Sequence, residues 1–218
     1  MHTQTEENYL KALFNLSFEK GVVTVQELSK ELQIKMPSVN SMVKKLAEKN
    51  LVQYESYKPL KLTAAGKIAA GLIIRKHRLT EMYLVQKMGF GWEQVHQIAE
   101  HIEHLQSELF FEKIDELLGY PNVDPHGSPI PDKNGNVQWL QYKKLSDCKI
   151  GDTIKLAAVT NSSEEFLKFL NGRNLYLGIV VTIKAIETFD ESMKVSYGNN
   201  KNEMLSKLVA EKLLTEKI

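Results

Sequence analysis

The stretch TVQELSKELQIKMPSVNSMVKKLAEKNLVQYESYKPLKL, residues 24–62, decides the fold of the N-terminal part of the chain. Thr24 and the pair Pro37-Ser38 are typical of helix starts, and apolar residues at helical spacing follow each of them. The last part, LVQYESYKPLKL, alternates apolar and polar residues around a Tyr57-Lys58-Pro59 turn, which is typical of a β-hairpin. The stretch therefore predicts two short helices followed by a hairpin.

Another helix is predicted upstream, over residues 5–18, with Thr5 as its cap. Its apolar residues form one stripe at helical spacing: Tyr9, Leu10, Leu13, Phe14 and Leu16. Three helices with tight joins and a hairpin are typical of a winged helix-turn-helix. We expect such a domain over residues 1–62.

Basic side chains are concentrated in this N-terminal region. Residues 1–78 carry 13 Lys and Arg against 7 Asp and Glu. A basic surface suits a polyanion, and the second helix of a helix-turn-helix pair enters the major groove of DNA. Taken alone, each polar residue of this segment is better interpreted as part of the solvated face of a helix. The order of the elements and the net positive charge nevertheless favour DNA binding for the segment as a whole. The predicted DNA contacts are Pro37, Ser38, Asn40 and Ser41 at the helix start, and Lys44, Lys45, Lys58 and Lys61.

The middle of the chain is acidic and has a helical pattern. Residues 79–140 carry 3 basic and 10 acidic side chains. One long helix is predicted from Thr63 to about Met88, and two more are predicted over about 93–105 and 107–118. We expect a helical domain over 63–120, followed by a proline-rich linker over 121–142.

The C-terminal part, residues 143–218, is rich in strand-like runs. DTIKLAAVT, YLGIVVTIKAIETF and MKVSYGN predict strands, and EEFLKFLNG predicts a short helix between the first two. These runs predict a small β-barrel. The last stretch, NEMLSKLVAEKLLTEKI, fits either a helix or a closing strand. The predicted fold class is mainly α with a small β part.

Histidine and acidic residues occur at ligand spacing in the acidic region. His77 and Glu81 are four residues apart on the long helix and are therefore neighbours on one face. Four residues of the next predicted helix fall within an arc of about 100°: His96, Glu100, Glu103 and His104. Carboxylates this close repel one another unless a divalent cation lies between them, so the pattern predicts a metal site. His2 and His101 are interpreted as surface residues.

The donor types indicate which metal such a site prefers. Carboxylate oxygen and imidazole nitrogen without sulfur favour hard or borderline ions such as Mn²⁺, although Zn²⁺ and Cu²⁺ bind the same atoms. The single cysteine, Cys148, excludes an intramolecular disulfide and a thiolate zinc cage, and it fits a cytoplasmic location. The longest apolar stretch, Ile68 to Ile74, is far shorter than the roughly 20 residues of a membrane-spanning helix, so we expect no membrane partner.

Two other functions remain open on the residues alone. Glu93-x-x-His96 has the form of one ligand pair of a carboxylate-bridged metalloenzyme, but the helical region has no second such pair. Zinc-hydrolase, phosphate-loop and nucleophile-elbow motifs are absent from the sequence, so we expect no enzyme and no organic small-molecule substrate. The other alternative is a metal-independent winged-helix regulator whose acidic middle binds a protein partner.

The order of these segments resembles the diphtheria toxin repressor family of metal-activated bacterial transcriptional repressors. The resemblance covers essentially the whole chain, and three motifs carry it: RKHRLTE (75–81), VHQIAEHIEH (95–104) and PHGSPIP (125–131). It implies a homodimer, formed through the helices after the hairpin, that binds a double-stranded DNA operator and represses metal-uptake genes. It also implies that residues 63–120 serve dimerisation and metal binding, and that residues 143–218 form an SH3-like domain of the FeoA type.

The resemblance further implies a ligand set. Glu100 is similar to the manganese-responsive branch, since the iron-responsive branch has a cysteine there, so Mn²⁺ is expected and Fe²⁺ is the alternative. Asn8 stands where both branches have a different ligand, and either Asn8 or Glu7 is expected to complete the first site. A second site is expected from Asp124 and His126 together with Glu164 or Glu165. Without metal, the carboxylates are expected to repel one another and to leave the DNA-binding heads loose.

Overall fold

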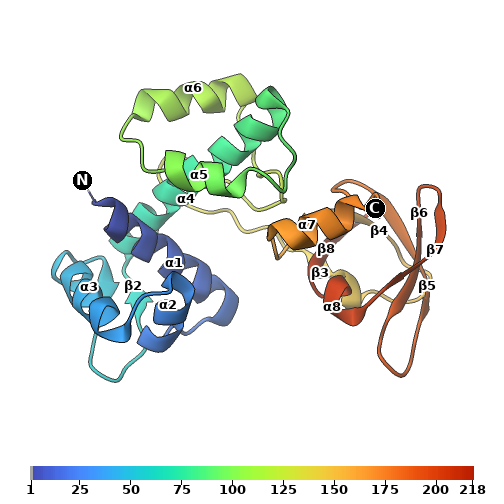
Figure 1. Ribbon diagram of the computed structural model, residues 1–218, viewed down its shortest axis with the longest axis horizontal. Helices are drawn as coiled ribbons and strands as arrows, with labels where there is room; N and C mark the ends of the chain where they lie inside the picture. Colours follow the sequence, from blue (N-terminus) through green and yellow to red (C-terminus); the bar gives the residue numbers. More distant parts are fainter. Residues whose placement is uncertain (1) are drawn as a thin grey trace. The chain divides into compact units, whose positions relative to one another are not determined.

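The computed structural model describes residues 2–218 (Figure 1). These residues form two compact units. The first unit contains the chain up to Thr80 together with Ala99–Asn122 and Ile130–Gln138. The second unit contains Glu81–Ile98, Val123–Pro129 and Trp139–Ile218. Within residues 2–218, no helix has both the length and the apolar character that crossing a bilayer requires.

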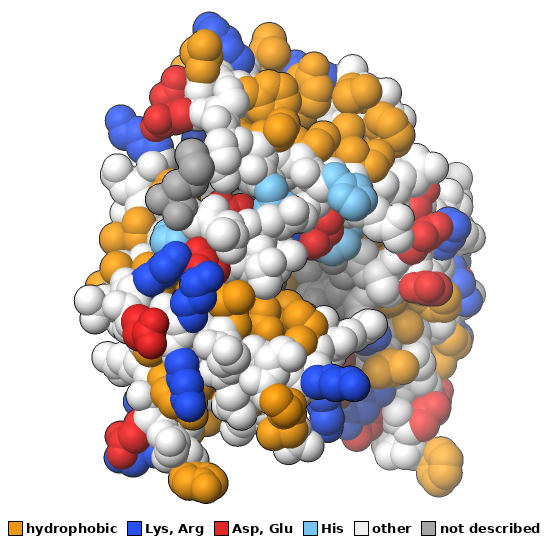
Figure 2. Space-filling view, turned by 60° about the vertical axis from the view of Figure 1, so that its left-hand side comes forward, with side chains coloured by type: hydrophobic (Ala, Val, Ile, Leu, Met, Phe, Trp, Pro, Cys, Tyr) orange, Lys and Arg blue, Asp and Glu red, His pale blue; other side chains and the backbone are white. Residues whose placement is uncertain are grey.

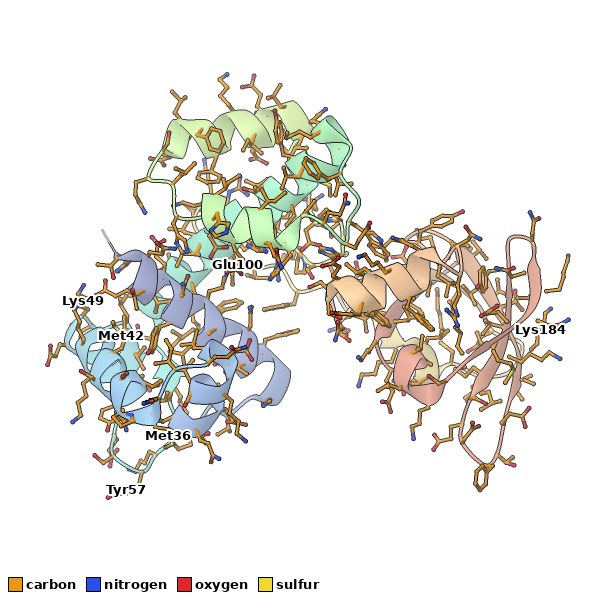
Figure 3. All side chains as sticks on the ribbon, viewed as in Figure 1. Met36, Met42, Lys49, Tyr57, Glu100 and Lys184 are labelled. Atoms are coloured by element: carbon orange, nitrogen blue, oxygen red, sulfur yellow. The ribbon has the colours of Figure 1, made fainter. Side chains whose placement is uncertain are left out.

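Within residues 2–62, the first unit has three helices and a two-stranded antiparallel sheet in the predicted order. Their bounds are α1 (Gln4–Lys20), α2 (Val25–Leu32), α3 (Met36–Glu48), β1 (Val52–Gln53) and β2 (Lys61–Leu62). Val52 pairs with Leu62, which sets the register of the sheet. Tyr57 lies at the fully exposed tip of the loop between the two strands (Figure 3).

Capping residues explain where the first two helices begin. Thr24 accepts a hydrogen bond from the backbone N–H of Glu27, and the Glu27 carboxylate accepts one from the N–H of Thr24, so the predicted cap of α2 is confirmed. The predicted cap of α1 at Thr5 is wrong. Thr3 caps this helix because Glu6 lies three residues after it and closes the same reciprocal pair of bonds.

Apolar side chains from α1 and α3 form much of the core of this region. Leu10 and Leu13 of α1 have no solvent exposure, and neither do Val39, Val43 and Leu46 of α3. Because the buried residues of α3 recur every three or four positions, one face of that helix is fixed against the core. The opposite face of α3 is therefore presented to solvent.

Three further helices follow the small sheet: α4 (Ala64–Met88), α5 (His96–Ile102) and α6 (Glu108–Leu118). Helix α4 runs through both units, since the first unit ends at Thr80 and the second takes over at Glu81. Helix α5 is shorter than predicted. Gln94 and Gly91 close a turn through two hydrogen bonds, of 2.9 Å each, and this turn keeps Glu93 outside the helix.

Residues 119–142 contain no helix or strand, apart from an isolated bridge between Val123 and Pro129. Arg75 of α4 holds the part of this segment that belongs to the first unit. Its guanidinium donates to the backbone oxygen of Pro131 at 2.7 Å and also pairs with the Asp115 carboxylate. This segment is therefore hydrogen-bonded to helix α4.

Within residues 139–218, the second unit has a six-stranded antiparallel sheet in the order β3-β8-β4-β5-β6-β7. The bounds are β3 (Lys143–Lys144), η1 (Leu145–Asp147), β4 (Thr153–Val159), α7 (Glu164–Asn171), β5 (Val180–Ile186), β6 (Met193–Tyr197), β7 (Asn200–Leu205), α8 (Lys207–Ala210) and β8 (Leu213–Lys217). Leu167, Leu170, Val181 and Val195 lie in its buried core. The tail that fitted either a helix or a strand contains both, because the short helix α8 precedes the closing strand β8.

Candidate metal centre

Four side chains of the first unit form an ion-pair cluster, the Lys11 cluster: Lys11, His77, Glu100 and Glu103. The Lys11 ammonium nitrogen lies 2.5 Å from Glu100 Oε1, and 2.7 and 2.9 Å from the two carboxylate oxygens of Glu103. His77 Nδ1 lies 2.6 Å from Glu103 Oε2. The ligand-type atoms of the histidine and the two glutamates all lie within 4.8 Å of one another, which is close enough to share one cation.

The ends of the helices place these side chains. Lys11 comes from α1 and His77 from α4. Glu100 comes from α5, as Figure 3 shows. Helix α5 ends at Ile102, but the Glu103 N–H still donates to the backbone oxygen of Ala99 at 2.9 Å. This last turn carries the Glu103 carboxylate into the interior, where the residue is 0% exposed.

Glu103 is ionised despite its burial. Burial alone raises the pKa of its carboxyl, but the hydrogen bond from His77 and the charges of Lys11 and His77 outweigh that effect, so the pKa lies below its ordinary value. The cluster therefore contains a buried negative charge that needs a cation close by.

A second contact joins α1 to the segment after α5. His104 Nδ1 lies 2.6 Å from Glu7 Oε2, and His104 Nε2 lies 3.5 Å from Glu103 Oε1. Gln106 donates to Glu7 Oε1 at 3.2 Å. Asn8 Oδ1, also on α1, is buried and has no hydrogen-bond partner among residues 2–218. A buried oxygen without a partner is unfavourable, so Asn8 offers a donor atom that a cation would satisfy.

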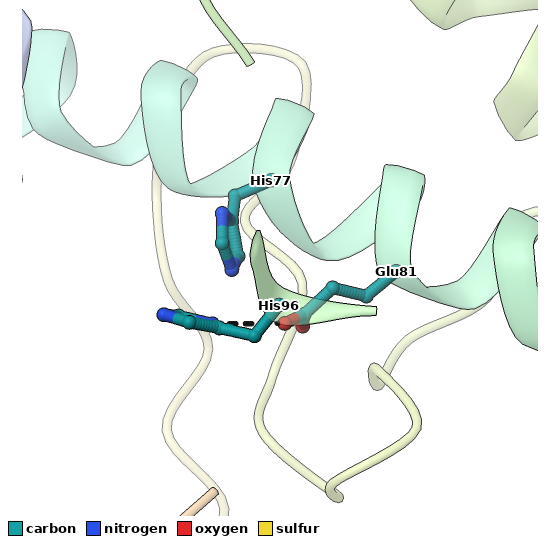
Figure 4. A group of neighbouring side chains, drawn as sticks. All are labelled: His77, Glu81 and His96. Atoms are coloured by element: carbon teal, nitrogen blue, oxygen red, sulfur yellow. Dashed lines mark hydrogen bonds and ion pairs between the residues drawn. The ribbon is translucent and has the colours of Figure 1, made fainter. Parts of the chain in front are cut away.

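The second unit has its own group of ligand-type side chains, the Glu81 group: Glu81, His96, Asp124 and His126. His96 Nδ1 lies 3.2 Å from Glu81 Oε1, and His126 Nδ1 lies 3.5 Å from Glu81 Oε2. Glu81, Asp124 and His126 are all buried. Figure 4 shows Glu81 one turn after His77 on α4, with His96 bonded to Glu81. Helix α4 therefore carries one residue of each cluster.

The linker brings Asp124 and His126 to this group through a tight turn. Asp124 Oδ1 accepts hydrogen bonds from the backbone N–H groups of His126 and Ser128, at 2.8 and 2.9 Å. Gly127 has a φ of +84°, and a Cβ atom there would lie 2.2 Å from the backbone oxygen of Ala157. Only glycine allows the turn to approach strand β4 this closely.

Trp92 and Glu81 fix the His126 ring from two sides. His126 Nε2 lies 2.9 Å from the backbone oxygen of Trp92, and the two rings stack with their centroids 6.0 Å apart. Burial alone lowers the pKa of His126, but the hydrogen bond and charge of Glu81 outweigh it and raise this pKa above its ordinary value. The imidazole is thus held in one orientation beside a carboxylate, as histidine ligands of metals usually are.

Both clusters offer oxygen and nitrogen donors, and neither includes a sulfur atom. This donor set suits hard and borderline divalent ions, Mn²⁺ and Fe²⁺ among them. Histidine and acidic side chains also reach the molecular surface next to one another on the face drawn in Figure 2. The residues present therefore fit a divalent cation.

The contacts of the six predicted helical ligands fall into two sets. Glu100, Glu103 and His104 contact side chains of α1 or α4 in the first unit, whereas Glu81 and His96 contact each other in the second. The Glu103 N–H donates to the backbone oxygen of Ala99, so the last turn of α5 extends to Glu103, and Glu100 and Glu103 both contact Lys11. His77 and Glu81 remain neighbours on α4, as the spacing predicts.

The remaining predicted ligands fall partly inside the clusters. Glu7, Asn8, Asp124 and His126 lie as described above. Glu164 and Glu165 belong to no ligand group among residues 2–218. Both lie in the first turn of α7, where Glu164 Oε1 is 2.5 Å from Lys168 Nζ and Glu165 is exposed. Sequence analysis missed Lys11, although its position one helical turn after Glu7 is a signal that it shares that face of α1.

The predicted DNA contacts lie on the outer face of α3 and on the hairpin. Lys45 Nζ is 3.3 Å from Glu6, and Lys58 Nζ is 2.8 Å from Glu55, so two of the predicted cations have carboxylate partners. Asn40 is half-buried, and the others are exposed: Pro37, Ser38, Ser41, Lys44 and Lys61. Met36 and Met42 are also on α3 (Figure 3).

Two parts of one family match the chain. "Iron dependent repressor, N-terminal DNA binding domain" matches residues 1–60, and "Iron dependent repressor, metal binding and dimerisation domain" matches residues 63–132. The iron-dependent repressor IdeR of Mycobacterium leprae is 34% identical over 128 residues, which are 58% of this chain and 55% of IdeR. The HTH-type transcriptional regulator MntR of Bacillus subtilis is 32% identical over 124 residues, which are 57% of this chain and 87% of MntR.

The match to IdeR thus spans about half of that protein's length. Solved structures match over more of the chain. A manganese-dependent transcriptional repressor in complex with manganese is 27% identical with a TM-score of 0.87, covering 98% of this chain and 100% of that one. ScaR with bound Zn²⁺ is 30% identical with a TM-score of 0.79, covering 98% and 99%. The chain therefore belongs to the iron-dependent repressor family, together with IdeR, the diphtheria toxin repressor and MntR.

Proposed function

We propose that the protein is a metal-activated transcriptional repressor that binds a double-stranded DNA operator as a homodimer and controls metal-uptake genes. One observation carries the proposal: ligand-type side chains of α1 and of the α5 segment meet in the first unit, where Glu7 contacts His104. Helix α1 also carries Asn8, whose buried oxygen has no hydrogen-bond partner among residues 2–218. A cation held there would tie the DNA-binding helices to α4 and α5.

The proposed activating ion is Mn²⁺, with Fe²⁺ as the alternative. The sulfur-free donors support Mn²⁺, as does the similarity to repressors described as manganese-dependent. The similarity to IdeR supports Fe²⁺. The proposed ligands in the first unit are Glu7, Asn8, His77, Glu100, Glu103 and His104, and in the second unit they are Glu81, His96, Asp124 and His126. Glu164 and Glu165 stay predictions.

The proposed mechanism is a shift of population between arrangements of the DNA-binding helices. When bound, the ion supplies two positive charges that oxygen and nitrogen donors from different helices share. The chain's part is to hold Glu103 ionised and His126 oriented, which pre-organises both groups of donors. A ligand shifts a conformational equilibrium only if it binds one state more tightly. A site that takes donors from both α1 and the α5 segment meets that condition.

We propose that the DNA contacts are the predicted ones on α3 and the hairpin. The exposed serines near the start of α3 would face base edges, and Lys44 and Lys61 would neutralise phosphates. The order of three helices and a two-stranded sheet supports a winged helix-turn-helix. Nothing in the proposal requires an enzyme activity or an organic substrate.

The proposed domain organisation is a DNA-binding domain over 1–62, a dimerisation and metal-binding domain over 63–120, a linker over 121–142 and an SH3-like domain over 143–218. The matched family segments, 1–60 and 63–132, support the boundary between the first two domains, and the second segment extends beyond residue 120. Exposed apolar side chains of α6 support a dimer interface there, because large apolar groups in one patch are typical of protein contacts: Leu109, Phe110 and Leu117. The antiparallel sheet supports the SH3-like assignment.

The proposed function is tested by selecting, from a random library, the DNA duplexes that the full-length protein binds. A random duplex library is incubated with the protein in excess Mn²⁺, in excess Fe²⁺ under anaerobic conditions, or in EDTA, and the retained duplexes are sequenced. The proposal expects a near-palindromic motif in Mn²⁺ and no enrichment in EDTA. Equal enrichment in EDTA would instead identify a metal-independent regulator, and enrichment in Fe²⁺ alone would identify the iron-responsive alternative.

A further inference from the structure

The Lys11 ammonium has all three of its hydrogen-bond positions filled by carboxylate oxygens. One contact goes to Glu100, at 2.5 Å, and two go to Glu103, at 2.7 and 2.9 Å. A lysine ammonium has three N–H donors and no acceptor, so this coordination is complete. The side chain is only 13% exposed, which places the charge inside the cluster and away from bulk water.

The two carboxylates around Lys11 are the same ones that the proposed function assigns to a metal ion. The oxygens that hold the ammonium are therefore oxygens that a cation in this cluster would need. A divalent ion on them would also place two positive charges within a few ångströms of the ammonium, which is itself largely shielded from water. Repulsion at that distance is strong, so the ion and the ammonium exclude each other from the cluster.

We propose that Lys11 is a built-in cation that occupies the Glu100–Glu103 position in the metal-free protein, and that an ion binds there only by displacing it. This inference rests on the proposed function and assigns to Lys11 the control of metal affinity. Lys11 links α1 to α5 across 89 positions of sequence. In the metal-free protein the positive charge of Lys11 therefore compensates the two carboxylates. The sequence predicts instead that these carboxylates repel one another and leave the DNA-binding domains loose.

Lys11 is therefore expected to raise the stability of the metal-free protein and to lower its affinity for the metal ion. The lysine stabilises the cluster when no ion is present, and that same stabilisation is lost when an ion enters. The two cations compete for one pair of carboxylates, so removing the lysine should strengthen ion binding and weaken the metal-free fold. A lysine that served the fold alone would weaken the fold and leave ion binding unchanged or poorer.

The test uses full-length variants without DNA. Lys11→Met removes the charge and keeps most of the chain length, and Lys11→Arg keeps the charge. Lys20→Met is the matched control, because Lys20 is also on α1 and pairs with Glu27 at 3.3 Å, but in an exposed position. Free Mn²⁺ is measured by electron paramagnetic resonance during titration, and thermal unfolding is followed by circular dichroism in EDTA.

The proposal expects Lys11→Met to bind Mn²⁺ about tenfold more tightly than the wild type and to unfold at a lower temperature in EDTA. Lys11→Arg and Lys20→Met are expected to keep the wild-type affinity. If Lys11→Met does not fold in EDTA, Lys11→Gln, which keeps one donor group, replaces it with the same expectation. Mn²⁺ affinity that is unchanged or weaker in the charge-removing variant overturns the inference.

The failure of the inference differs from the failure of the proposed function. If the wild type binds Mn²⁺ and Lys11→Met binds it equally well, the inference is wrong and the function stands. If Lys11→Met gains affinity but Mn²⁺ does not change DNA binding, the inference stands and the function is wrong. If neither protein binds Mn²⁺, both the inference and the manganese assignment of the proposed function are wrong.

Discussion

Replacing Glu103 with glutamine separates the structural and metal-binding roles of the buried carboxylate. The wild-type side chain accepts two hydrogen bonds from Lys11 and lies 2.6 Å from His77 Nδ1. Glutamine keeps one carbonyl oxygen, but its amide group is a donor and faces groups that also donate. The negative charge that balances Lys11 is lost at the same time.

The size of the effect follows from these contacts. Removing one partner of a buried ion pair costs about 3–5 kcal/mol. Lys11 keeps its 2.5 Å contact with Glu100 and glutamine keeps one acceptor, so we expect a loss of about 2–3 kcal/mol in the metal-free free energy of unfolding. For metal binding, the loss of a carboxylate ligand is expected to weaken Mn²⁺ affinity by about 100-fold or more, which is about 2.7 kcal/mol.

The assay combines urea unfolding in EDTA with Mn²⁺ titration of the same preparation. Glu116→Gln is the control, because Glu116 has an exposed pair with Lys113 at 2.5 Å and belongs to neither cluster. We expect the control to match the wild type in both measurements. Reduced stability with unchanged Mn²⁺ affinity would refute the reasoning, since Glu103 would then be a structural residue only.

Three further predictions follow from other parts of the molecule. Burial raises the pKa of the Glu6 carboxyl, but the hydrogen bond from Lys49 and further contacts outweigh this effect and lower the pKa from 4.5 to about 2. The ionised carboxylate therefore stabilises the fold above its ordinary pKa. This contribution is lost as the pH falls from about 4.5 to 2. Glu6→Gln should therefore flatten the dependence of unfolding free energy on pH in that window, and an unchanged acid profile would count against it. Gly127→Ala should lower the free energy of unfolding by about 2–4 kcal/mol in chemical denaturation, because φ is +84° and the new Cβ would clash with the backbone oxygen of Ala157. A variant as stable as the wild type would contradict this close packing. Lys44→Ala should reduce the salt dependence of DNA binding by about one unit of slope while Mn²⁺ affinity stays unchanged, and an identical slope would remove Lys44 from the phosphate contacts.

Capping residues and apolar spacing predict the helices of the N-terminal region well. The prediction of the helix start is wrong only for α1, where Thr3 and Thr5 are both possible caps. Thr24 was predicted as a cap because apolar residues at helical spacing follow it, and the structure confirms it. Thr5 carries a similar signal, but Thr3 has a glutamate three residues later and therefore forms the reciprocal pair that starts the helix. Helix starts are decided by such pairs rather than by one residue type.

The candidate ligands were found from their types and spacing, but their grouping was not. Spacing along one helix shows which of its residues share a face, but it does not show which residues of other helices they contact, such as Lys11 and Glu7 of α1. The approach of His126 to Glu81 depends on the linker turn at Gly127, which no periodicity encodes. The role proposed for Lys11 has no signal in a ligand pattern, because an ammonium group has no electron pair to donate to a metal.

The central claim is that a divalent cation couples α1 to the α5 segment and thereby controls DNA binding. Its most direct test is fluorescence anisotropy of the full-length protein on a selected duplex, titrated with Mn²⁺ and then with EDTA. The account predicts that DNA affinity rises by about 5–150-fold with Mn²⁺ and falls again when the chelator is added. Equal affinity with Mn²⁺ and with EDTA would contradict it.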